Sequence, residues 1–92
     1  MNIQQFKTMW QEDGTQLILH DTKKVNDFEL QLYAVLYPER TVEYGRHMAL
    51  VVQIDKKGEI VAHDLNNIIG TTNVTQEMKN WFNQCVIEAE CA

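Results

Sequence analysis

The sequence predicts an α+β domain with an N-terminal helix, a four-stranded antiparallel meander and a C-terminal helix packed on the sheet. Three patterns predict it: apolar residues with helical spacing at both ends of the chain, a central segment of strict apolar–polar alternation, and a hairpin-type turn between two further apolar segments. Because domains usually contain about 50 to 200 residues, we expect the chain to form one domain, 1–92.

Both ends of the chain carry helix signals. Asn2 can cap the first helix and Gly14 can end it. Asn73, with Gln76 three residues later, resembles a capping box at the start of the last helix. The apolar positions are Ile3, Phe6, Met9 and Trp10 in the first helix, and Met78, Trp81, Phe82, Cys85, Val86 and Ala89 in the second.

Four segments between the helices are predicted to be strands. The second alternates with period two and ends before Pro38, which cannot donate a ladder hydrogen bond. The third and fourth flank DKKG, a turn in which Gly58 fits a left-handed position. The predicted strands are TQLILHD (15–21), FELQLYAVLY (28–37), MALVVQI (48–54) and EIVAHDL (59–65).

The turn also predicts a register. With Asp55 opposite Glu59, His63 lies opposite Val51. One face then continues Phe28 and Leu30 through Leu50, Val52, Ile54, Ile60 and Ala62, and the other collects Tyr33, Val35, Tyr37, Ala49, Val51, Gln53, Val61 and His63. The second face is more apolar than a solvent-facing sheet surface requires. We therefore expect both helices on the Phe28 face and a partner on the tyrosine face; in the alternative, one helix packs on each face.

A self-complementary patch closes a dimer, so we expect the chain to bind a second copy of itself through the tyrosine face. Another protein or a small ligand is the alternative partner. Tyrosine is favoured at interfaces because a large apolar ring carries a hydrogen-bonding tip. The candidate interface or ligand-binding residues are Tyr33, Val35, Tyr37, Val51, Gln53 and His63.

Polar residues also crowd the long connection before the third strand, and functional residues favour such loops. These loop candidates are Arg40, Glu43, Tyr44, Arg46 and His47.

The sequence offers no converging catalytic set. His20–Asp21 and His63–Asp64 lie at opposite edges of a meander, so they cannot meet within one chain. The chain contains no serine and no histidine or cysteine spacing typical of metal ligands. We therefore expect no catalytic residue, no metal and no cofactor, and a binding protein rather than an enzyme.

Charge and cysteine usage restrict the partners and the compartment. Thirteen acidic against eight basic residues give a net charge of −5, which argues against nucleic-acid binding. The longest apolar run, MALVV, is far too short for a membrane helix, and the first residues lack a secretory signal. Cys85 and Cys91 are too far apart on one helix for a disulfide. These features indicate a cytoplasmic protein with free thiols.

In its outline from Ile3 to Ala89, the helix–four strands–helix order resembles small orphan α+β proteins of mobile gene cassettes and prophages. That resemblance implies a compact single domain that is often dimeric. A homodimeric interaction module is the leading functional hypothesis. One alternative is a phage-type inhibitor with an acidic surface containing Glu29, Glu39, Glu43 and Asp64. Another is a ligand-binding protein or enzyme with a pocket at a dimer interface.

Overall fold

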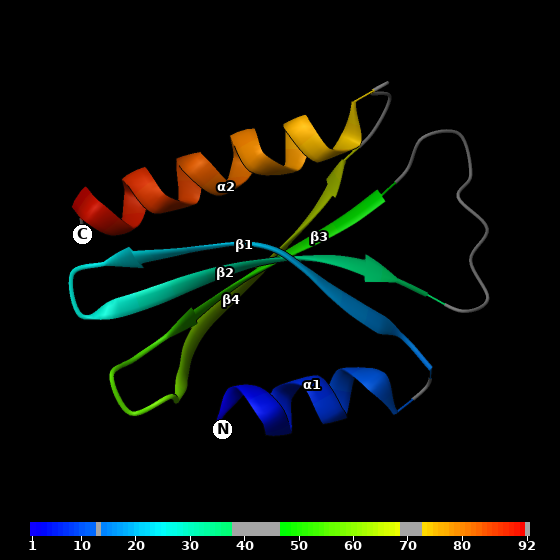
Figure 1. The fold of residues 1–92 in the computed structure, drawn as a ribbon, viewed down its shortest axis with the longest axis horizontal. Coiled ribbons are helices and arrows are strands. Elements are labelled where there is room, and N and C mark those ends of the chain that lie inside the picture. Colours follow the sequence, from blue (N-terminus) through cyan, green and yellow to red (C-terminus); the bar gives the residue numbers. More distant parts are fainter. Residues whose placement is uncertain (13, 38–46, 69–72, 92) are drawn as a thin grey trace.

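Residues 1–12, 14–37, 47–68 and 73–91, described by the computed structural model, form two helices and one antiparallel sheet (Figure 1). The strands lie side by side in chain order. The predicted α+β class and the order of its elements are confirmed. The elements are α1 (Ile3–Gln11), β1 (Gln16–Val25), β2 (Phe28–Leu36), β3 (His47–Ile54), β4 (Ile60–Ile68) and α2 (Val74–Cys91).

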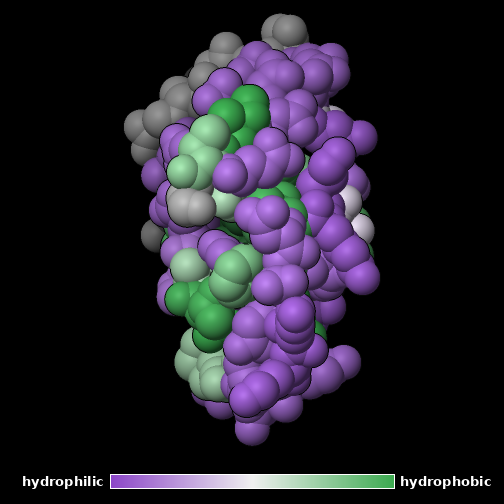
Figure 2. Space-filling model, turned by 90° about the vertical axis from the view of Figure 1, so that its left-hand side faces the viewer, coloured by the Kyte–Doolittle hydropathy of each residue, from purple (hydrophilic) through white to green (hydrophobic). Residues whose placement is uncertain are grey.

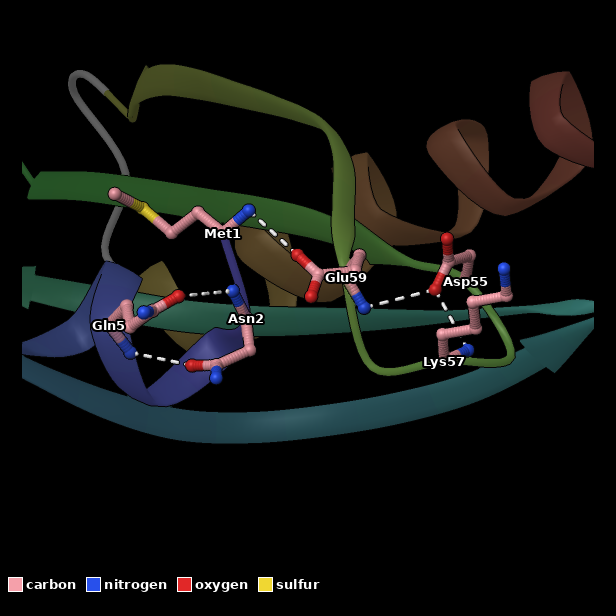
Figure 3. Close-up of polar contacts among 6 residues, drawn as sticks. All are labelled: Met1, Asn2, Gln5, Asp55, Lys57 and Glu59. Atoms are coloured by element: carbon pink, nitrogen blue, oxygen red, sulfur yellow. Dashed lines mark hydrogen bonds and ion pairs between the residues drawn. The ribbon is translucent and has the colours of Figure 1, made fainter.

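Side-chain hydrogen bonds fix where the helices begin. Asn2 Oδ1 accepts a hydrogen bond from the Gln5 amide at 2.9 Å, and Gln5 Oε1 accepts one from the Asn2 amide at 3.0 Å (Figure 3). Asn73 Oδ1 accepts from the Gln76 amide at 3.1 Å at the start of α2. Gly14, just beyond α1, has a φ of 88°, a conformation open to glycine without steric penalty. The predicted N-caps are confirmed, whereas the C-cap of α1 is Glu12 and not Gly14, and the Gln76 side chain donates to Asn80 Oδ1 at 2.9 Å.

The turn between β3 and β4 also forms as predicted. The Gly58 amide donates to the Asp55 carbonyl at 3.1 Å, and the Asp55 amide donates to the Glu59 carbonyl at 2.9 Å. Gly58 has a φ of 81°. Asp55 Oδ1 also accepts from the amides of Lys57 and Glu59, each at 2.9 Å (Figure 3). This turn therefore fixes the start of the β3–β4 hairpin.

The two helices cover opposite faces of the sheet (Figure 1). On the α1 face the buried cluster is Phe6, Tyr33, Val35, Leu50, Val52 and Ile54. On the α2 face it is Val25, Leu30, Leu32, Ala49, Val51, Ile68, Met78, Phe82 and Val86. Each face carries a row of large apolar side chains, and a covering helix removes each row from water. The expectation that both helices share the Phe28 face is wrong, and the one-helix-per-face alternative is correct.

Strand pairing corrects the predicted composition of the faces. Tyr33 lies opposite Leu50, and Leu32 lies opposite Val51. Directly opposed residues of an antiparallel pair point to the same face, so Tyr33 and Val51 lie on opposite faces. The hairpin turn specifies how β3 pairs with β4, but the connection 38–46 does not reveal which residue of β3 opposes β2. A displacement of one residue exchanges the two faces of a strand.

A β-bulge corrects the register between β3 and β4. Ile54 pairs with Ile60, whereas Gln53 pairs with Ala62, which leaves Val61 as an extra residue on β4. His63 consequently lies opposite Val52, one position from the predicted Val51.

Candidate functional site

β4 is an outermost strand of the sheet, and its middle is exposed. Exposed residues run without interruption from Val61 to Leu65. Among the described residues, no strand pairs with the outer side of β4 beyond a single bridge between Asn2 and Glu59. An edge strand presents unpaired backbone N–H and C=O groups, which form a template for another chain. We call the segment Ala62–Ile68 the β4 edge.

The N-terminal residues close the start of β4. The Ile60 amide donates a hydrogen bond to the Met1 carbonyl at 2.8 Å. The Met1 ammonium lies 2.7 Å from Glu59 Oε2 (Figure 3). Asn2 forms its bridge with Glu59 at the same place. The available part of the strand therefore begins after the bulge at Val61.

Apolar side chains flank this available backbone. Val61 is 52% exposed and Leu65 is 39% exposed. Leu65 pairs with Leu50 and so belongs to the α1 face, whereas Asp64 pairs with Val51 and belongs to the α2 face. An incoming strand would thus meet an apolar residue on one face and a carboxylate on the other.

The opposite edge, β1, carries the usual protection of natural sheet edges. Its pairing with β2 shifts between Leu19 and Asp21, which leaves His20 as an extra residue in mid-strand. β1 also continues beyond the predicted end at Asp21 and places two exposed lysines, Lys23 and Lys24, on the edge. Mid-strand bulges and edge lysines both discourage pairing with another chain. The β4 edge has neither lysine nor proline, and its bulge precedes it.

Figure 2 shows the side of the molecule that is at the left in Figure 1, where hydrophobic atoms form separate patches between broad hydrophilic areas. The exposed large apolar residues come from several elements: Met1, Met9, Ile18, Leu19, Leu36, Val61, Leu65 and Ile87. Four of them lie on the two outermost strands: Ile18 and Leu19 on β1, just before its mid-strand bulge, and Val61 and Leu65 on β4.

The predicted interface residues do not form one surface. Tyr33 and Val35 are buried on the α1 face, where Phe6 packs against the same cluster, and Tyr37 is half-buried beside it. Val51 is buried on the α2 face.

Two further interface candidates also lie on different faces. Gln53 pairs with Leu30 and so points to the α2 face. His63 is exposed on the α1 face, and its ring centroid lies 5.4 Å from that of Phe6. Of the six predicted interface residues, His63 alone belongs to the β4 edge.

Four of the loop candidates, Arg40, Glu43, Tyr44 and Arg46, lie outside the described residues. His47 is described as the first residue of β3 and is half-buried opposite Ile68.

A chain of polar side chains runs along β2 on the α1 face. The Tyr33 hydroxyl donates to Gln31 Oε1, and Gln31 Nε2 donates to Glu29 Oε2 at 2.8 Å. Lys7 Nζ lies 5.1 Å from the centroid of the Tyr33 ring, a cation–π contact. Burial raises the pKa of Tyr33, and the nearby Glu29 carboxylate adds to the effect. The hydroxyl is therefore a neutral donor whose bond helps to hold the core.

The thiols and histidines do not converge on a reactive centre. Burial raises the pKa of Cys85 to about 11, with smaller contributions from Glu88 and Asp64, so its thiol is protonated at neutral pH. His20 and His63 belong to the two outer strands, separated by β2 and β3. Within the described ranges, no group of three or more His, Cys, Asp or Glu residues could hold a metal ion.

The acids expected on one surface are also divided. Glu29 pairs with Ile54 and points to the α1 face, whereas Asp64 points to the α2 face. Glu39 and Glu43 lie outside the described residues.

Sequence reasoning missed Leu65 and Val61 as exposed apolar residues at an edge. One signal could have found them: the last strand of a meander has a neighbour on one side only, and 60–68 lacks the lysines that usually protect such a strand.

Comparisons with protein-family models, curated proteins and solved structures found no match for this chain. Of the two described helices, neither is long and apolar enough to cross a membrane.

Proposed function

We propose that this chain is a protein-binding module whose β4 edge accepts an extended segment of a partner as an additional strand. The observation that supports the proposal is the uninterrupted exposure of Val61–Leu65 on an outermost strand without lysine or proline. In strand addition, main-chain hydrogen bonds supply affinity, and alternate side chains supply specificity.

The side chains of the β4 edge define what the partner segment should contain. Leu65, on the α1 face, favours an apolar residue directly opposite. Asp64, on the α2 face, favours a hydrogen-bond donor such as an amide, a hydroxyl or a basic group. A matching segment alternates these two kinds of residue in extended conformation.

Binding rather than catalysis is part of the proposal. The Tyr33 hydroxyl already donates to Gln31, and the raised pKa of Cys85 keeps its thiol protonated. A cytoplasmic setting is supported by Cys85 and Cys91, which are both free thiols and therefore suit a reducing compartment.

A library of displayed random nine-residue peptides tests the proposal. Selected peptides are titrated into the ¹⁵N-labelled protein, and amide shifts are mapped. The expected shifts fall on residues 62–68, and binding should weaken at least tenfold in Leu65→Lys. Binding should stay unchanged in Ile87→Lys, which makes the same kind of substitution at an exposed apolar position of α2. Shifts that map to another surface would contradict the proposal.

A further inference from the structure

We infer that the strand accepted by the β4 edge comes from a second copy of this chain, which gives a continuous eight-stranded antiparallel sheet about a twofold axis at Leu65. This inference rests on the proposed function, because it names the occupant of the same edge. Two observations support it: a twofold axis permits only a few registers between two copies of β4, and the N-terminal residues already occupy the start of that strand.

Symmetry restricts how two copies of one strand can pair. A twofold axis pairs residue i with residue j and residue j with residue i. Opposed residues of an antiparallel pair point to the same face, and residues on one face are an even number of positions apart. The positions i and j of an opposed pair therefore differ by an even number, so one residue lies midway between them in the sequence. That residue lies at the axis, opposite its own copy in the second chain. Each possible register is specified by naming that residue.

Three of the central residues are unfavourable. Asp64 at the axis would place two carboxylates opposite each other, a destabilising pair. Asn66 at the axis would place the Asp64 carboxylate opposite Ile68. His63 at the axis would require the backbone of Ile60, whose amide already donates to the Met1 carbonyl.

Leu65 at the axis satisfies all these conditions. The paired segment is then Ala62–Ile68, which begins after the bulge and leaves the N-terminal bridge intact. The two Leu65 side chains, each 39% exposed in the single chain, cover each other on the α1 face.

The polar residues of the edge also find partners in this register. Asp64 faces Asn66 of the second copy on the α2 face, and the Asn66 amide can donate to the carboxylate. His63 faces Asn67 of the second copy on the α1 face, where ring and amide can form a hydrogen bond. Because the axis is perpendicular to the sheet, both α1 helices lie on one side of the joined sheet and both α2 helices on the other.

Solution mass by light scattering over a tenfold concentration range tests the occupant. We expect the wild-type chain at about twice its mass of 10.7 kDa. Leu65→Lys, which places two ammonium groups at the axis, should shift the mass to that of one chain. Val61→Lys is the matched control, because Val61 is also an exposed apolar residue of the same strand but lies outside the paired segment.

A cysteine at the axis tests the register. In a background of Cys85→Ala and Cys91→Ala, Leu65→Cys should form a disulfide-linked dimer on mild oxidation. Opposed Cα atoms lie about 4.5 to 5.5 Å apart, within the range that a disulfide spans. Val61→Cys should not cross-link, because its two copies lie eight residues apart along the strand, ~27 Å at ~3.4 Å per residue.

The outcomes separate this inference from the proposed function. A wild-type chain that stays monomeric, or a dimer unaffected by Leu65→Lys, overturns the second copy as the occupant. Peptides that still map to 62–68 would then support the proposed function with a different partner. A dimer that depends on Leu65 but cross-links through Val61→Cys and not Leu65→Cys overturns the register.

Discussion

Leu50 of β3 lies directly opposite Leu65 of β4, yet Leu50 is fully buried and Leu65 is 39% exposed. Both residues point to the α1 face. Leu50 is covered because β3 is an inner strand beneath the Phe6 cluster, whereas β4 pairs with β3 alone among the described strands. The same apolar residue type is thus core on one strand and available surface on the next. The β4 edge follows from that difference.

The burial of the α1 face predicts a large effect of removing its helix anchor. Phe6→Ala should lower the free energy of unfolding by about 3 to 5 kcal/mol, because a buried ring is lost from the core. Urea denaturation measures the change. Met9→Ala is the control on the same helix, where an exposed side chain should change stability by less than about 0.5 kcal/mol. Equal effects of the two variants would contradict the packing of α1 on the sheet.

The hydroxyl of Tyr33 should contribute a measurable part of the stability. Tyr33→Phe keeps the buried ring but removes the donor to Gln31, so the free energy of unfolding should fall by about 1 kcal/mol. Tyr33→Ala, which also empties the site, should lower it by about 3 to 5 kcal/mol. A Tyr33→Ala chain as stable as wild type in urea would mean that this residue is not buried.

Substitution of Gly58 should lower the stability of the chain because of its backbone conformation and not because of a steric clash. An added Cβ would have nothing within 4 Å, but the φ of 81° is unfavourable for any other residue type. Gly58→Ala should therefore destabilise the chain by about 1 kcal/mol in thermal or urea unfolding. The neighbouring Lys57→Ala, an exposed position, should have little effect; a larger effect there than at Gly58 would contradict the predicted origin in the turn.

The two thiols should react differently as pH rises. Alkylation at neutral pH, followed by mass spectrometry, should label the exposed Cys91 first. Cys85 should react only as the pH approaches about 11, because the thiolate is the nucleophile. Prior labelling of Cys85 at neutral pH would be inconsistent with its burial.

The same raised pKa also gives the sign of a stability change. The unfolded Cys85 loses its proton near its ordinary pKa of about 9, whereas the folded one keeps it to about 11. The stabilising contribution of the buried, protonated Cys85 to the free energy of unfolding is therefore complete below pH 9 and is lost as pH rises towards 11. Cys85→Ala should reduce this alkaline loss of stability.

Local signals in the sequence were sufficient for the type and order of the elements, although β1 and β4 continue beyond their predicted ends at Asp21 and Leu65. Asn2 and Gln5 form a capping box from residues three positions apart, and Gly58 meets the need of one turn for a left-handed residue. Such features depend on neighbours in the chain, so they can be recognised without the tertiary structure.

Long-range relations were not predictable in the same way. Tyr33 pairs with Leu50, and this register between β2 and β3 cannot be read from the connection 38–46. The observed register differs from the predicted one so that the β3 residues lie on the faces opposite to those expected. The extra residue Val61 places His63 opposite Val52 and not opposite Val51. The bulge contains no glycine by which it could be recognised in the sequence. The apolar spacing of α1 predicts that the helix packs on the sheet, but it does not indicate which face of the sheet the helix covers. These three unknowns explain why the six predicted interface residues are divided between the two faces of the sheet.

Amide hydrogen exchange at the β4 edge is the most direct measurement of the central claim. We expect the outward amides of residues 62–68 to be protected in the wild-type protein and to exchange rapidly in Leu65→Lys, while β1 exchanges equally in both. Rapid exchange at 62–68 in the wild type, unchanged by Leu65→Lys, would contradict a β4 edge that is occupied by a second copy of the chain.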